Sequence, residues 1–222
     1  MSSPPPFLSR GGNGFLASFG HAWRGLIHTV VYQRNMRVHV LSAMLVSLVG
    51  SGIPLGLAEK VTLIFCVLLI FFAEILNSAL EHLVDLAVQQ FDEKARVTKD
   101  AAAAGVLVLA IGTVVIFAAI LVANWDTVTG NTPRVLHQVQ LGLPLAGLTW
   151  LLISPRPRPA LLDALLFAAA LALLTLLTLD TASTVFSAMS VGLLVVAGAA
   201  ALTRRREAAR LPARQPAPDT RA

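Results

Sequence analysis

Six long apolar stretches restrict this chain to a membrane fold. A helix needs about 20 predominantly apolar residues to cross the hydrocarbon core of a bilayer. Charged residues make up only 13% of the 222 residues, against about 25% in soluble domains. The sequence therefore predicts an all-α integral membrane protein. The expected membrane spans are residues 38–57, 60–82, 101–123, 135–153, 160–179 and 184–202.

The basic residues predict how these spans are oriented. Of the 17 Lys and Arg residues, 15 lie before the first span, after the second or fourth span, or in the C-terminal tail. The connections on the other side contain only Lys60 and Arg134. Because basic loops stay in the cytoplasm, we expect both termini there. This topology accounts for the net charge of +5 without a nucleic acid partner, and we expect none.

The segment ahead of the first span predicts a surface helix. Between residues 15 and 31 the apolar residues recur at helical spacing, while Arg24, His28 and other polar residues lie mostly on the remaining faces. This pattern is typical of an amphipathic helix that lies in the membrane interface. The alternative is a soluble helix packed on the bundle. Beyond these segments we expect a flexible lead at residues 1–13 and a basic disordered tail at residues 204–222.

The second predicted span brings acidic and amide residues to membrane depth. At 1.5 Å per residue, Glu74 lies roughly 20 Å along a helix that begins near residue 60. Glu81 and Asp85 return to within about 20° of the direction of Glu74, and Asn77 and Ser78 flank the same face. The spacing predicts a polar stripe that runs from inside the bilayer to the cytoplasmic interface.

Two interpretations of the stripe remain open. An ionisable group at this depth costs about 2.5–3.5 kcal/mol on insertion scales, and such groups usually face the bundle interior and serve a function. The alternative is a protonated Glu74 that hydrogen-bonds a neighbouring helix. Carboxylates near the interface bind Mg²⁺ together with substrate phosphates, and Lys99 before the third span is either a phosphate ligand or a topology anchor. The functional interpretation is phosphoryl transfer from ATP to a membrane alcohol.

These residues carry a family resemblance. The stretch "AEILNSALEHLVD" at residues 73–85, the later "KDAAAAGVL", and "AWRGL" and "RNMRVH" before them resemble the bacterial integral-membrane diacylglycerol kinases, a family that includes undecaprenol kinases. The resemblance covers about residues 15–124. It implies a three-span kinase with an N-terminal surface helix, working as a homotrimer in the bacterial inner membrane. We therefore expect a kinase domain at residues 14–124 and a three-span extension of unexplained role at residues 133–203.

The resemblance implies a role for each matching position. Glu74 would be the general base on the lipid hydroxyl, and Asn77 would orient it. ATP would be the co-substrate and Mg²⁺ the cofactor. The remaining assignments are Glu81 and Gln33 as metal ligands, Lys99, Asp100, Asp85 and Glu81 as nucleotide-binding residues, and Glu74, Ser78, Trp23 and Arg37 as residues that bind the lipid.

Two positions depart from the family pattern. Gln33 stands where the family often has a metal-binding Glu, and Gly14 stands where a basic residue is common. Diacylglycerol kinase is the main hypothesis, with undecaprenol as the alternative acceptor. A non-catalytic lipid-binding or assembly subunit is the hypothesis from another class, and a proton carrier using Glu74 is a weaker third. Asp163 and Asp180 lie near span ends, where we expect them to be solvated.

Overall fold

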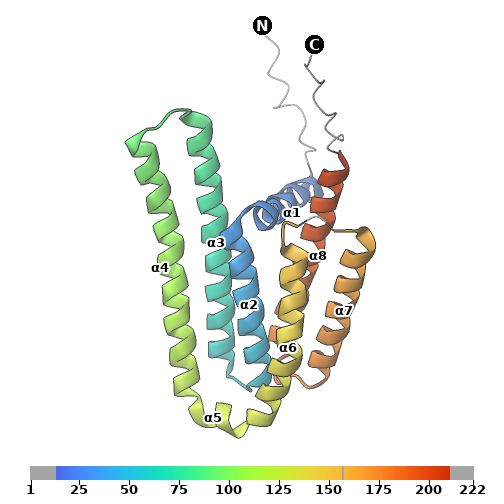
Figure 1. Cartoon of the computed structure of the whole chain (residues 1–222). Coiled ribbons are helices and arrows are strands. Elements are labelled where there is room, and N and C mark those ends of the chain that lie inside the picture. The colour runs from blue at the N-terminus through green and yellow to red at the C-terminus, as the bar shows by residue number, and fades with distance from the viewer. Residues whose placement is uncertain (1–13, 157, 211–222) are drawn as a thin grey trace, which may run out of the picture.

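The computed structural model describes residues 14–156 and 158–210, and these residues form helices joined by short connections (Figure 1). The all-α membrane fold is confirmed, with no strand in the described ranges. The helices are α1 (Phe15–Tyr32), α2 (Arg34–Gly52), α3 (Leu57–Ala87), α4 (Glu93–Ala123), α5 (Trp125–Gly130), α6 (Thr132–Ile153), α7 (Ala160–Leu179) and α8 (Thr184–Arg210).

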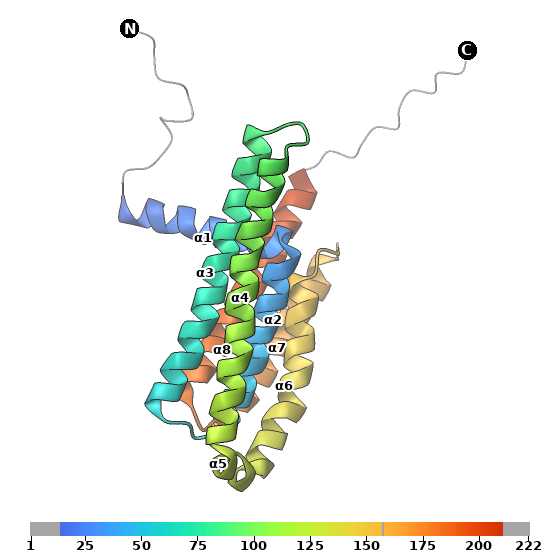
Figure 2. The same ribbon diagram turned by 90° about the vertical axis from the view of Figure 1, so that its left-hand side faces the viewer.

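The surface helix α1 lies across the bundle at a steep angle to the other long helices (Figure 2). Its Ile27, Val30 and Val31 are buried, whereas Phe15 and Leu16 at its start are exposed. The chain turns sharply into α2 at Gln33, which has an extended backbone. The last carbonyl groups of a helix lack partners within it, and the Arg37 Nη1 donates to the Val31 carbonyl oxygen at 2.7 Å across this turn.

Within residues 14–156 and 158–210, five helices are long and apolar enough to cross a membrane, namely α3, α4, α6, α7 and α8. The predicted span at residues 38–57 is not among them, and its predicted end is corrected. It corresponds to α2, which begins with a polar turn and ends at Gly52. Ile53 is extended because the residue before a proline, here Pro54, disfavours the helical conformation. Nevertheless α2 lies inside the bundle (Figure 1), where it contacts α3, α6 and α8.

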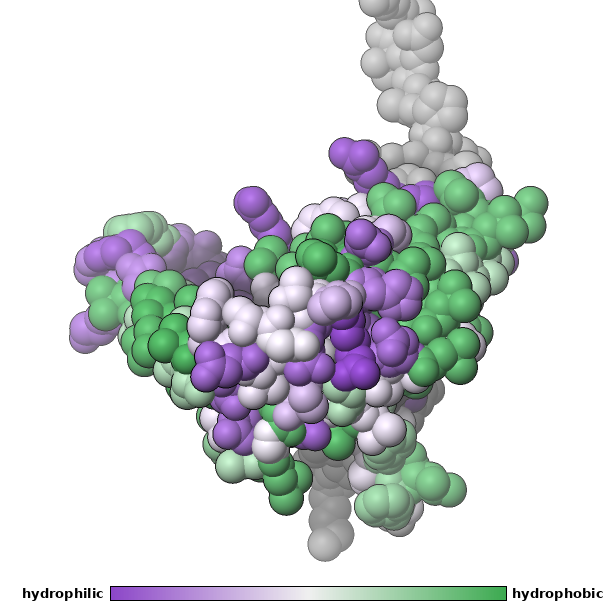
Figure 3. Space-filling model, turned by 90° about the horizontal axis from the view of Figure 1, so that it is seen from below, coloured by the Kyte–Doolittle hydropathy of each residue, from purple (hydrophilic) through white to green (hydrophobic). Residues whose placement is uncertain are grey.

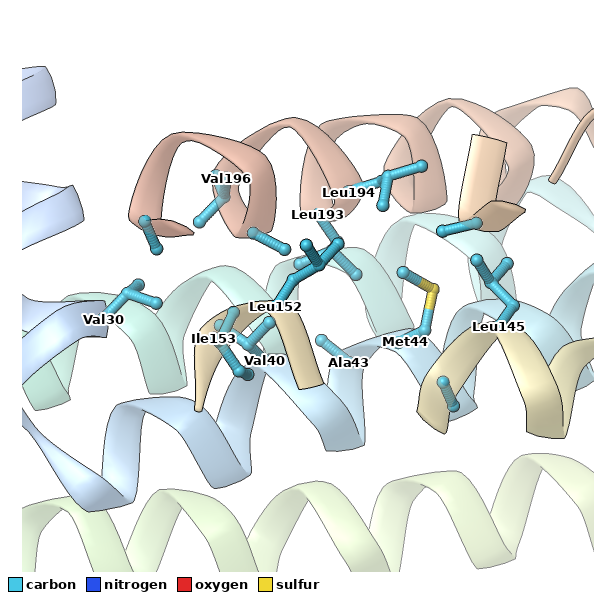
Figure 4. Packing of buried hydrophobic residues seen from close by; sticks show 14 of the residues in the cluster. Val30, Val40, Ala43, Met44, Leu145, Leu152, Ile153, Leu193, Leu194 and Val196 are labelled. Carbon is cyan, nitrogen blue, oxygen red and sulfur yellow. The ribbon is translucent and has the colours of Figure 1, made fainter. Parts of the chain in front are cut away.

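The main hydrophobic core joins the first and last parts of the chain. Val40, Ala43 and Met44 of α2 pack against Leu145 and other buried residues of α6 and α8 (Figure 4). Since neighbouring helices surround α2, it needs no continuous apolar surface of its own. This explains why its sequence is less apolar than that of the lipid-facing helices.

Helices α3 and α4 form a long hairpin beside this core (Figures 1 and 2). The Asp92 side chain caps α4 by accepting a hydrogen bond from the Ala95 N–H at 2.9 Å. Helix α4 packs mainly on α3, and Val106 is its one buried residue. Most of its apolar surface is therefore left for lipid or for another protein chain.

The two ends of the bundle differ in charge. The start of α1, the α3–α4 turn, the α6–α7 connection and the end of α8 all lie at one end (Figure 1), which we call the arginine-rich end. The opposite end carries α5, and seen from below its hydrophilic residues gather near the middle with hydrophobic ones around them (Figure 3). The predicted separation of basic from sparsely charged connections therefore appears in the fold.

The two aspartates expected to be solvated differ from each other. The side chain of Asp180 is 49% exposed and lies 3.6 Å from Arg134. Asp163, however, is 9% exposed, and one of its oxygens accepts a hydrogen bond from Arg204 at 2.9 Å. That part of the prediction was wrong, because α8 continues through residues 204–210, part of the expected tail, and brings Arg204 against α7. The expected lead and the rest of the tail lie outside the described residues.

One glycine fixes a close approach between α2 and α8. A Cβ atom on Gly50 would lie 2.6 Å from the fully buried ring of Phe186. We expect Gly50→Val to lower the free energy of unfolding by about 1–3 kcal/mol, because the buried ring has nowhere to move. Gly147→Val is the matched control, since nothing lies within 4 Å of its Cβ position. Equal stability of the two variants in denaturant unfolding experiments would contradict this expectation.

Candidate active site

Glu74 lies buried in the middle of the α3 segment, on the side that faces α2 and α4. Glu74 is 1% exposed. It lines a cavity of about 230 Å³ together with Asn77 of α3 and Ala103 and Val106 of α4. Its Oε2 atom has no hydrogen-bond partner among the described residues. A buried carboxylate oxygen without a partner is energetically costly, so this oxygen is available to a hydroxyl group that enters the cavity.

Asn77 lines the same cavity as Glu74 and contacts the next acid of the stripe. Asn77 is 4% exposed, and its Nδ2 donates to the Glu81 Oε1 at 3.1 Å. Its own Oδ1 has no partner in the described part of the chain. Because the side chains of residues four apart lie on one face of a helix, this contact follows from the spacing that the sequence showed.

The stripe continues to an ion pair between the two helices of the hairpin. The Nζ of Lys99 on α4 donates to the Asp85 carboxylate on α3, so two of the residues assigned to the nucleotide lie together. Asp100 instead pairs with Arg96 one turn earlier, with 2.7 Å between the Nη1 and Oδ2 atoms. All of these groups are at least partly exposed near the arginine-rich end.

Ser78 and Gln33 line a different cavity from Glu74. This second cavity, of about 260 Å³, lies between the turn region of α1 and α3 and also contains His28 and His82. His82 donates from Nδ1 to the Ser78 carbonyl oxygen at 2.6 Å. The residues lining this cavity do not include Glu81, so the structure of one chain does not bring the two expected metal ligands into one pocket.

The two remaining residues assigned to the lipid lie away from the Glu74 cavity. Trp23 lines a cavity between α1 and α8 together with Arg206 and Glu207. Arg37 is engaged at the turn between α1 and α2 by its contact with the Val31 carbonyl oxygen. In a single chain both residues therefore support the placement of α1 rather than the pocket around Glu74.

Two polar α2 residues that were not predicted as site residues also line the Glu74 cavity. They are Asn35 and His39. Their spacing of four residues places them on one face of α2, and this spacing is visible in the sequence. What the sequence lacked was the identity of the helix that this face contacts.

The polar atoms of the site are suited to a hard cation and its phosphates. Glu81, Asp85 and the free Oδ1 of Asn77 offer oxygen ligands, which Mg²⁺ prefers, and this ion usually takes only one or two carboxylates in addition to substrate phosphates. Among the described residues, no group of three or more His, Cys, Asp or Glu side chains gathers to hold a metal ion. The donor set thus fits a cation that arrives with ATP better than a cage built by one chain.

Comparison with known proteins identifies relatives of the same part of the chain. Residues 20–121 match the prokaryotic diacylglycerol kinase family. The chain is 37% identical to the diacylglycerol kinase of Synechocystis sp. over 102 residues, which are 46% of this chain and 58% of that protein. It is 36% identical to the undecaprenol kinase of Bacillus subtilis over 99 residues, 45% of this chain and 80% of that protein.

A third relative is more distant. The diacylglycerol kinase of Escherichia coli K12 is 29% identical over 96 residues, which are 43% of this chain and 79% of the relative. No solved structure shows a significant match to the chain. The family match ends at residue 121, so α6, α7 and α8 lie outside the matched segment.

Fold, site and relatives together define the class of this protein as the membrane-embedded lipid kinases. The matched segment contains most of α1, all of α2 and α3, most of α4, and every residue of the polar stripe. The chain belongs to the prokaryotic diacylglycerol kinase family. The multi-pass membrane character predicted from the apolar stretches agrees with this membership.

Proposed function

We propose that α1 to α4 form an ATP-dependent kinase that phosphorylates diacylglycerol to phosphatidate. The observation that supports this most strongly is Glu74, a buried carboxylate with an unpartnered oxygen in a cavity at membrane depth. A membrane alcohol can present its hydroxyl group there, whereas ATP stays in the aqueous phase. The polar residues from Asn77 to Lys99 then connect the two compartments along one hairpin.

The proposed reaction transfers one proton and one phosphoryl group. Glu74 takes the proton from the lipid hydroxyl while the hydroxyl oxygen forms a bond to the γ-phosphorus of ATP. The bond from that phosphorus to the β–γ bridging oxygen breaks, and ADP leaves. Asn77 orients the reacting groups beside Glu74 and holds Glu81 through its amide. Lys99 exchanges its contact with Asp85 for the phosphates of ATP.

Mg²⁺ is part of the proposal because of the oxygen donors near the exposed end of the stripe. Glu81 would hold the ion, and Gln33 would join it only through a rearrangement that brings Gln33 to Glu81, which does not line the Gln33 cavity. When bound, the ion neutralises the charge on the transferring phosphate. Asp85 holds Lys99 until ATP binds, and Asp100 holds Arg96 on the same nucleotide side of the site.

The site is proposed to face the cytoplasm of a bacterial inner membrane. The arginine-rich end would then be cytoplasmic, as the positive-inside rule requires. A homotrimer is also proposed, and the support for it is the largely unpartnered surface of α4. The mass of the protein in a detergent of known bound mass tests this assembly, with three chains per particle expected and a monomer contradicting it.

Undecaprenol is the second candidate acceptor. The observation in its favour is the match to the undecaprenol kinase of Bacillus subtilis, which covers 80% of that relative. Both acceptors present a hydroxyl group at the end of apolar chains, and apolar pockets discriminate weakly between such chains. The catalytic residues proposed above would serve either alcohol.

The acceptor is tested directly with the purified full-length protein in lipid. Labelled ATP and Mg²⁺ are supplied, diacylglycerol and undecaprenol are offered in parallel, and a reaction with a Mg²⁺ chelator serves as the control. We expect label in the lipid phase with diacylglycerol. Transfer to undecaprenol alone would select the second candidate, and transfer to neither would favour a non-catalytic subunit.

Gln33 provides a separate test of the metal site. We expect Gln33→Glu to lower the Mg²⁺ concentration needed for half-maximal rate by about three- to tenfold, because a carboxylate binds this cation better than an amide. Gln89→Glu adds the same charge at an exposed position just after α3 and is the control. An unchanged Mg²⁺ dependence in Gln33→Glu would show that Gln33 is not a metal ligand.

A further inference from the structure

A partly enclosed apolar cavity lies between α7 and α8, outside the segment that matches the kinase family. Its volume is about 360 Å³, and its walls include Ala164 and Phe167 of α7 and Gly198 and Leu202 of α8. This volume falls within the range of cavities that bind small ligands. A Cβ atom on Gly198 would lie 2.7 Å from the Phe167 ring, so the glycine allows this ring to form the wall.

Charged side chains lie at the end of this cavity. Asp163 lines it, accepts a hydrogen bond from Arg204 at 2.9 Å, and has Arg158 at 3.8 Å from its other oxygen. All three side chains are close to nine-tenths buried, and the Oδ1 of Asp163 has no hydrogen-bond partner in the described ranges. Arg205 also lines the cavity. Two guanidinium groups thus contact a single carboxylate and a third lines the same cavity, which leaves an excess of positive charge.

Three consecutive arginines of α8 have different surroundings. Arg204 is committed to Asp163 and to the carbonyl groups of Leu152 and Ser154 at the end of α6. Arg206 lines the separate cavity that contains Trp23. Arg205 is exposed, and within the described part of the chain no carboxylate forms an ion pair with it. It is therefore available to an anion at the mouth of the apolar cavity.

We propose that this cavity binds an anionic glycerophospholipid, with one acyl chain between α7 and α8 and the phosphate at Arg205. The apolar walls match the chain, and the excess positive charge matches the phosphate. Basic pockets between membrane helices bind anionic headgroups in this way. A zwitterionic lipid would fill the same walls, but it would bring its own cation toward the guanidinium groups. The site does not depend on the kinase function proposed above.

The test compares two lipids in one membrane. The full chain is reconstituted in vesicles of equal amounts of phosphatidylglycerol and phosphatidylcholine with identical acyl chains, and retained lipids are counted by native mass spectrometry after gentle extraction. The protein is expected to retain phosphatidylglycerol at least about fivefold over phosphatidylcholine. Arg205→Gln is expected to lower this preference by about fivefold, the effect of one basic residue near a membrane surface.

Two matched controls keep the proposal falsifiable. Arg206→Gln removes the same charge one residue away, outside this cavity, and should leave the preference unchanged. Ala164→Trp fills the cavity and should abolish the preferential retention of phosphatidylglycerol. Ala168→Trp lies one turn further along α7, is not among the lining residues, and should leave this retention unchanged. Equal retention of the two lipids by the unmodified protein would overturn the proposal. The proposal would also be overturned if Arg205→Gln and Arg206→Gln reduced the preference equally, since this would show a general attraction of anionic lipids to the basic surface.

Discussion

Replacing Glu74 by Gln is expected to lower the rate of lipid phosphorylation by about 10²–10⁴-fold, the contribution of a positioned general base. Glutamine keeps the size of the side chain but cannot take the hydroxyl proton. The stability of the protein should not fall, because Glu74 Oε2 has no hydrogen-bond partner that the substitution would remove. The measurement is transfer of labelled phosphate from ATP to diacylglycerol, together with thermal unfolding of the same preparation.

The control for this prediction lies on the same helix. Glu59→Gln makes the identical chemical change in the first turn of α3, at the opposite end from the arginine-rich end. It should leave the rate within about twofold of the unmodified protein, since surface substitutions away from special features have small effects. If Glu74→Gln remained fully active, Glu74 would not be the base, and the interpretation of the stripe as helix-to-helix hydrogen bonding would be favoured.

Replacing Arg204 by Gln is expected to lower the free energy of unfolding by about 3–5 kcal/mol, because breaking a buried ion pair leaves an uncompensated charge. Asp163 and Arg204 have side chains only 11% and 12% exposed. The substitution would leave Asp163 with the more distant Arg158 at 3.8 Å. It would also remove the donor at the carbonyl group of Leu152, 3.1 Å away, where α6 ends. Denaturant unfolding in detergent micelles measures the effect.

A substitution of Asp163, the partner of Arg204, tests whether the unpaired charge causes the loss of stability. Adding Asp163→Asn to Arg204→Gln removes the unpaired charge, and we expect the double variant to recover part of the lost stability, giving a coupling energy of about 0.5–3 kcal/mol in the double-mutant cycle. Arg206→Gln is the control, because it removes the same charge at an exposed position two residues later. It should alter the free energy of unfolding by no more than about 0.5 kcal/mol. A double variant as unstable as the sum of the two single changes would show that the ion pair contributes nothing.

Helix positions were largely predictable because they depend on local composition. The apolar stretch at residues 160–179 coincides with α7, since a run of Leu and Ala residues between two turns leaves no other structure in a bilayer. The predicted span at residues 38–57 also forms a helix, α2, but its end was predicted five residues too late. Its helix is surrounded by α3, α6 and α8, so composition alone did not reveal its place or its end at Gly52.

The site was predictable along one helix and unpredictable between helices. Helical periodicity places Asn77 and Glu81 on one face, and the structure joins them by a hydrogen bond. Periodicity gives no information about which helix faces them. For this reason the contributions of Asn35 and His39 to the Glu74 cavity were missed. The assignment of Gln33 as a metal ligand came from the family resemblance and stays a prediction.

The sequence by itself determined that this chain is a helical membrane protein, which segments become helices, and that Glu74 and its neighbours form a polar stripe. These properties follow from the length of apolar runs and from the 3.6-residue period, both of which are local. Only the tertiary structure decided that α6 and α8 share one core with α2, and that Asp163 is buried against Arg204 instead of solvated. Such contacts depend on how surfaces of distant segments fit together, and no short window of sequence contains that information.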